Sequence, residues 1–99
     1  MKRRALTPTE IVTRLAEFPG WKLSGDGDEV AIEKSFEFAN YHEVMAFVNA
    51  LAFIAHKTDH HPDLSVHYKR CVVRYRSHDV QGISEADFRG AAQADALLA

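Results

Sequence analysis

The chain has 99 residues, of which 26% are charged and 46% hydrophobic, and its formal net charge is −2. These values are ordinary for a globular protein, and the length allows one domain, which we expect to cover residues 1–99. The slightly acidic balance argues against a nucleic-acid-binding surface spread over the whole domain.

The cysteine content and the distribution of apolar residues limit which cellular compartment and which kinds of site are possible. A single cysteine, Cys71, excludes an internal disulfide and a thiolate metal site, and its apolar surroundings predict a core position. No apolar run has the length of a membrane span. The basic cluster Lys2-Arg3-Arg4 is followed by no apolar stretch, so we expect a solvated tail and a cytoplasmic protein.

The first predicted elements are a helix and a hairpin. Thr7, Pro8 and Glu10 form a capping box, which predicts a helix over residues 8–18, before Pro19-Gly20. Residues 21–23 then read as a short strand, followed by a turn over 25–28. Apolar and polar residues alternate from residue 30 to 38, as expected for a longer, half-buried strand.

The pattern then repeats. A cap at Asn40 precedes apolar residues at helical spacing, predicting a helix over residues 41–57. Strands are expected at 64–68 and from 71 to 78, with the chain turning at Lys69–Arg70. A further cap at Ser84, with Asp87 three residues later, starts the last helix. The order αββαββα predicts an α+β fold, with a four-stranded antiparallel sheet and helices packed on one face.

Three histidines carry the chemical signal of the sequence. His60 and His61 are followed by Pro62, which disfavours helical geometry at His61 and places the pair between helix and strand. A turn at Lys69–Arg70 would set His61 opposite His78, roughly 4.5–5.5 Å away. Imidazoles exchange protons near neutral pH, so the pattern predicts a proton-transfer centre.

Two other interpretations of these histidines stay open. They can be incidental residues of a surface loop. Alternatively, His56 and His60, spaced one helical turn apart with Asp59 and Asp63 nearby, can form a zinc site. The glutamate of the HExxH motif is missing and the predicted helix ends between them, so we expect no metal. His42 and His67 are expected to face solvent or, for His67, a partner subunit.

The segment His60-His61-Pro62-Asp63, followed by Ser77-His78, Gly82-Ile83-Ser84 and Asp87, resembles the pterin-4a-carbinolamine dehydratase family. The resemblance includes Trp21 and the order of elements, and so covers nearly the whole chain. It implies that the catalytic residues are His60, His61 and His78. It also implies substrate-binding or supporting positions at Trp21, His56, Pro62, Asp63, Ser77 and Asp87. His56 stands where family members usually carry a glutamate.

The implied activity is dehydration of a 4a-hydroxytetrahydropterin to the quinonoid dihydropterin, without metal or redox cofactor. On this reading His61 and His78 share the acid–base work, while His60 binds or orients the pterin. The alternative is a non-enzymatic interaction module, because relatives serve as a transcription-factor dimerisation cofactor and as assembly factors. The presence of all three histidines favours the enzyme, whereas the histidine at position 56 in place of the usual glutamate slightly favours the interaction module. Unpaired sheet edges predict a homodimer or homotetramer.

Overall fold

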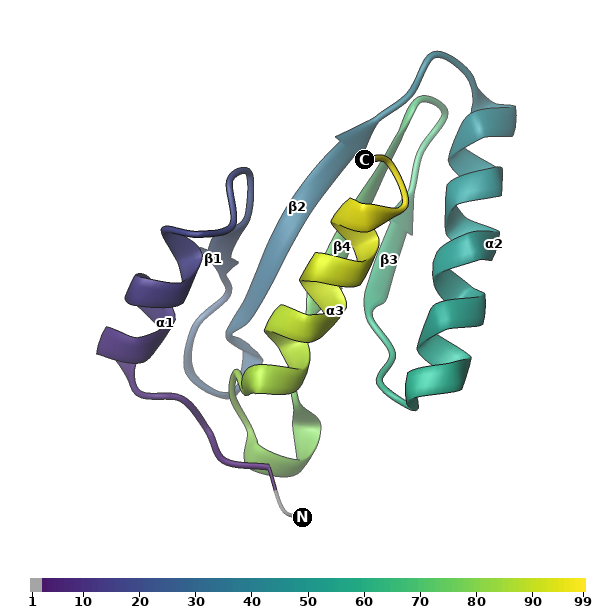
Figure 1. Ribbon diagram of the computed structural model, residues 1–99. Helices are drawn as coiled ribbons and strands as arrows, with labels where there is room; N and C mark the ends of the chain where they lie inside the picture. Colours follow the sequence, from purple (N-terminus) through teal and green to yellow (C-terminus); the bar gives the residue numbers. More distant parts are fainter. Residues whose placement is uncertain (1–2) are drawn as a thin grey trace.

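A four-stranded antiparallel sheet, with strand order β1-β2-β4-β3, organises the computed structural model, which describes residues 3–99 (Figure 1). The strands are β1 (Lys22–Ser24), β2 (Ala31–Glu37), β3 (Asp63–Val66) and β4 (Arg70–Tyr75). The helices are α1 (Pro8–Leu15), α2 (Tyr41–Thr58) and α3 (Glu85–Ala96), with short 3-10 turns η1 (Gly27–Glu29) and η2 (His78–Val80). The predicted fold class and element order are confirmed. Within residues 3–99 no helix is both long and apolar enough to cross a bilayer.

The core lies between one face of the sheet and the helices. Strands β2 and β4 turn alternate residues inward, among them Phe36, Cys71 and Val73, and all three are buried. The helices cover them with one continuous cluster of apolar side chains. This confirms Cys71 as a core residue, and burial raises the pKa of its thiol.

The predicted caps of all three helices are present, but α1 is shorter than expected. Thr7 and Glu10 form a capping box, and Asn40 accepts a hydrogen bond from the backbone of Glu43. The helix ends at Leu15, not at residue 18. The backbone N–H of Phe18 bonds three residues back, to Leu15, and this tighter turn leads into the proline that disfavours helix before it.

The predicted turn of the second hairpin is wrong by one residue, which shifts its register by two. The backbone N–H of His67 donates to the carbonyl oxygen of Arg70 at 2.8 Å, so the chain turns at residues 68–69. Arg70 itself is paired with Glu37 of β2 and is therefore unavailable for the turn. The shift preserves which side chains face the core, but His61 no longer stands opposite His78.

His78 lies outside β4, although the sequence predicts that this strand reaches residue 78. Ser77 and Gly82 form an isolated bridge, with backbone hydrogen bonds of 2.8 and 3.3 Å, and this bridge closes a tight loop around η2. Gln81 adopts a left-handed conformation within the loop. His78 is consequently held in a turn at the end of β4.

Gly90 allows α3 to pack directly on Tyr75. A Cβ atom at position 90 would lie 2.5 Å from Cε1 and 2.6 Å from Cζ of the Tyr75 ring. Tyr75 is only 1% exposed and cannot move without disturbing the core.

We therefore expect Gly90→Ala to destabilise the protein despite the better helix propensity of alanine. Overpacking costs about 1–3 kcal/mol, whereas the propensity gain is about 1 kcal/mol. Gly82→Ala is the matched control, because its Cβ would have ordinary contacts at 3.8 Å. Denaturant unfolding of the two variants measures the difference. Equal stability of Gly90→Ala and the parent would contradict the packing described here.

Candidate active site

The three predicted histidines line one cleft, although not by the predicted strand pairing. The cleft has a volume of about 400 Å³ and includes His60, His61, Pro62, Asp63 and His78. His61 and His78 are exposed, so it is an open depression and not an enclosed cavity. Another hollow, of about 300 Å³ between α2 and α3, is mainly apolar and contains no histidine.

Two left-handed turns bring the histidines to the cleft. Asp59, at the end of α2, has φ of 56°, and Gln81, after η2, has φ of 50°. They are the only non-glycine residues with positive φ in residues 3–99. Such conformations cost roughly 1–2 kcal/mol, less for aspartate, and they concentrate at functional sites. Each one reverses the chain beside a histidine of the cleft.

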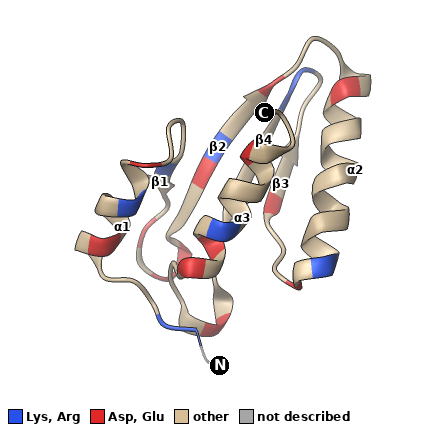
Figure 2. Cartoon of the chain, viewed as in Figure 1, with Lys and Arg blue, Asp and Glu red and all other residues tan. Residues whose placement is uncertain are grey.

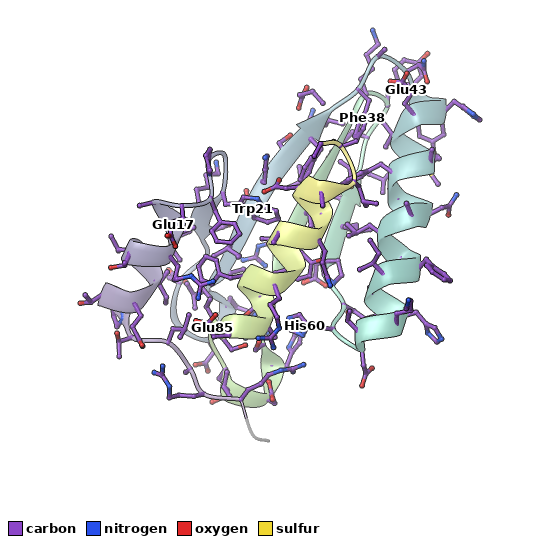
Figure 3. All side chains as sticks on the ribbon, viewed as in Figure 1. Glu17, Trp21, Phe38, Glu43, His60 and Glu85 are labelled. Carbon is purple, nitrogen blue, oxygen red and sulfur yellow. The ribbon has the colours of Figure 1, made fainter. Side chains whose placement is uncertain are left out.

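His60 is held by a buried carboxylate. Its Nε2 lies 2.6 Å from Oδ1 of Asp87, a residue that is fully buried in the first turn of α3. A carboxylate only accepts, so His60 carries a proton on Nε2. Figure 3 shows His60 beside the start of α3, toward the end of α2. The imidazole is thereby fixed in orientation.

The other oxygen of Asp87 is also satisfied. Oδ2 accepts from the Ser77 hydroxyl and from the Ser84 backbone N–H, both at 2.9 Å. The two serine hydroxyls lie 2.7 Å apart. Asp87 therefore joins the loop around η2, the start of α3 and His60 in one buried hydrogen-bond network.

Tyr75 supports the other side of His60. The two rings are stacked, with centroids 5.8 Å apart and planes inclined by 11°. Burial, followed by the charge of Asp87, raises the pKa of Tyr75 to about 12. The phenol therefore stays protonated near neutral pH and contributes packing, not proton transfer.

His78 has a different neighbour. Nη1 of Arg76 lies 2.6 Å from Nδ1 of His78, and Nη2 donates to the backbone carbonyl of Asp28 in η1. Arg76 is 8% exposed. Arg76 continues the alternation by which β4 turns side chains away from the core, yet it is buried, lines the cleft and ties it to the first hairpin.

Two of the expected binding positions lie apart from the cleft. Trp21 is 5% exposed and its indole N–H donates to Asp95 at 3.0 Å. In Figure 3 it lies on the side of α3 that faces α1, and its ring centroid is 6.2 Å from that of Tyr75, which separates it from His60. His56 is exposed on α2 and does not line the cleft.

The sequence did not place four charged residues in this cleft, namely Arg3, Asp59, Arg76 and Asp79. Figure 2 shows charges of both signs at this end of the molecule. Nη1 of Arg3 lies 3.4 Å from Oδ1 of Asp79. Arg3 is therefore part of the cleft wall and not of a free tail. Lys2, placed in the same predicted tail, lies outside the described residues. No group of three or more metal-ligating side chains occurs within residues 3–99.

Comparison with known proteins places this site in a family. The sequence model described as "Pterin 4 alpha carbinolamine dehydratase" matches residues 4–97. The chain belongs to this family. A protein of Paracidovorax citrulli, provisionally named pterin-4-alpha-carbinolamine dehydratase, is 69% identical over 98% of this chain and 84% of its own length. A similarly named protein of Bdellovibrio bacteriovorus is 53% identical over 95% of the chain and 78% of its own.

Solved structures agree with this assignment. A transcriptional coactivator/pterin dehydratase from Brucella melitensis superposes with a TM-score of 0.87 and 30% identity, covering 94% of this chain and 97% of its own. A pterin dehydratase-like protein, described as a RuBisCO assembly factor of the alpha-carboxysome, has a TM-score of 0.67 and 26% identity, over 79% and 88% of the two chains. The chain is assigned to the hydro-lyases of the pterin dehydratase family.

We expect Asp87→Asn to lower both stability and dehydratase activity. An amide cannot accept from His60, Ser77 and Ser84 together, and its N–H₂ group would face a protonated Nε2. The loss of charged hydrogen bonds costs about 1.5–3 kcal/mol, and misorienting an acid–base group costs about 10²-fold in kcat/KM or more. Thermal unfolding and steady-state kinetics measure the two effects.

Glu43→Gln is the matched control for this substitution. Glu43 also accepts a backbone N–H beside a helix start, that of Ala39 at 3.1 Å, but at the far end of the molecule from His60 (Figure 3). Its kcat/KM should equal that of the parent. Full activity in Asp87→Asn would contradict a role for the carboxylate in orienting His60.

Proposed function

We propose that this cleft dehydrates a 4a-hydroxytetrahydropterin to the quinonoid dihydropterin by histidine acid–base catalysis. The observation that carries the proposal is the convergence of His60, His61 and His78 on one cleft, with His60 held by a buried carboxylate. Membership of the dehydratase family supports it independently. The histidine site thus provides a chemical reason for the activity that the family name describes.

The reaction needs little more than two proton transfers. The C4a–O bond breaks as the hydroxyl takes a proton and leaves as water, and N5 loses its proton as the C4a=N5 double bond forms. The cleft volume of about 400 Å³ lies within the usual range for small-molecule sites, about 300–1,000 Å³. Because the cleft is open, a substituent on the pterin ring can extend into solvent.

The surroundings of the three imidazoles suggest different roles. His61 is exposed and forms no side-chain hydrogen bond within the described residues, so it is free to take or give a proton. His60, with Nε2 bound to Asp87, presents only Nδ1 to a ligand. We propose that His61 exchanges protons with the substrate and that His60 binds and orients the ring.

A second candidate function is a protein-binding module on the same fold. The assembly-factor relative motivates it, and the exposed apolar side chains give it a surface. The rings of Tyr41 and Tyr68 are stacked with their centroids 6.2 Å apart, and these side chains are 48% and 71% exposed. Phe53 is 66% exposed. The same surfaces and the free edges of β1 and β3 suit association into a homodimer or homotetramer. Both the oligomer and the cytoplasmic location stay predictions.

The experiment that tests the proposal follows the loss of 4a-hydroxytetrahydropterin generated in situ. We expect rapid dehydration by the parent and a fall in kcat/KM of about 10²- to 10⁴-fold for His61→Ala. His42→Ala is the control, because His42 is exposed near the start of α2 and lines none of the hollows described above.

Two outcomes of this assay would contradict the proposal. A folded parent that does not accelerate dehydration over buffer would exclude the enzyme proposal and leave the protein-binding module. A parent that is active but insensitive to His61→Ala would assign the proton transfer to another residue.

A further inference from the structure

We infer that Arg76 is a positioning residue that fixes His78 as a hydrogen-bond donor toward the cleft. The catalytic consequence rests on the proposed function, whereas the orientation of the ring does not. The inference comes from one contact, that of Nη1 of Arg76 with Nδ1 of His78 at 2.6 Å.

The chemistry of the two groups determines the direction of this hydrogen bond. A guanidinium has only donors and does not lose its proton in proteins. Nδ1 of His78 must therefore accept, which requires a lone pair on that nitrogen. The proton of the neutral ring is then on Nε2, the nitrogen left free to meet a ligand in the cleft.

The guanidinium of Arg76 is itself fixed in position by a second hydrogen bond. Its Nη2 donates to the carbonyl of Asp28, which locks the guanidinium against η1 of the first hairpin. The side chain is nearly buried, and none of the ion pairs found within residues 3–99 includes Arg76. A buried cation without a carboxylate partner is costly, so ordinary surface stabilisation does not explain Arg76.

The arrangement divides the work between the histidines. With Nδ1 occupied, His78 donates a hydrogen bond through Nε2, and we place that bond on the oxygen of the leaving hydroxyl. A donor aimed at the departing oxygen stabilises charge that develops as the C–O bond breaks. On this inference the proton transfers fall to His61, and His78 acts as a hydrogen-bond donor instead of sharing the acid–base work as the sequence predicts.

Imidazole NMR tests the orientation without any substrate. At about pH 8.5, well above the ordinary histidine pKa, the neutral ring of His78 should carry its proton on Nε2. The Nδ1 resonance should move in Arg76→Met, where its hydrogen bond is lost. It should stay in place in Arg74→Met. A proton on Nδ1 of His78 in the parent would overturn the inference.

Arg74 provides a close match for the control. It lies on the same strand and donates to the neighbouring carbonyl of η1, that of Glu29, at 2.8 Å, but it contacts no histidine. Arg74→Met therefore removes a tether to the first hairpin while leaving the Arg76–His78 pair intact. Any effect confined to Arg76→Met belongs to the contact with His78.

A double-mutant cycle tests whether Arg76 acts through His78. Arg76→Met should lower kcat/KM about 10- to 100-fold, the range seen when a group that orients a metal-binding histidine is lost. In a His78→Ala background the same substitution should change kcat/KM less than about twofold, because its target is gone. Arg76→Lys, which keeps the charge but not the fork, should fall between the parent and Arg76→Met.

The outcomes separate the two proposals. Equal losses from Arg76→Met in both backgrounds would show a role independent of His78 and overturn the inference. Thermal unfolding of each variant identifies losses caused by instability. A parent without dehydratase activity would exclude the proposed function, and the NMR measurement would still decide the orientation of His78.

Discussion

A carboxylate buried away from water must have each oxygen hydrogen-bonded, and Asp87 meets this requirement with partners from three separate segments. His60 comes from the loop after α2, Ser77 from the end of β4, and Ser84 from the cap of α3. The cap that starts α3 is thus also the support of the cleft. Folding of this helix and orientation of His60 depend on the same side chain.

The remaining geometry follows from how the chain enters and leaves the sheet. Left-handed turns at Asp59 and Gln81 reverse the chain on either side of β3 and β4, and each turn presents a histidine to the same cleft. The rings of Tyr75 and His60 are stacked over the core, and Gly90 allows α3 to approach that stack. The exposed imidazoles therefore rest on a rigid base, as catalytic loops on stable scaffolds do.

Much of this arrangement could be predicted from the sequence because it depends on local signals. Caps at Thr7, Asn40 and Ser84 defined the helices, and alternation defined the inward face of β2 and β4. The hairpin register could not be predicted, since it depends on the pairing of Arg70 with Glu37, a contact between distant segments. The histidines nevertheless converge, because the loop around η2, and not strand pairing, positions His78. Arg76 was missed because nothing in strand alternation indicates a buried arginine.

His60, His61 and His78, supported by Asp87, are proposed to form one pterin site. Titration of the parent with a stable dihydropterin, followed through the imidazole resonances of all six histidines, tests it most directly. We expect the resonances of His60, His61 and His78 to shift together in one saturable step, while those of His42 and His67 do not respond. Saturable shifts centred on other residues, with the three rings unchanged, would contradict it.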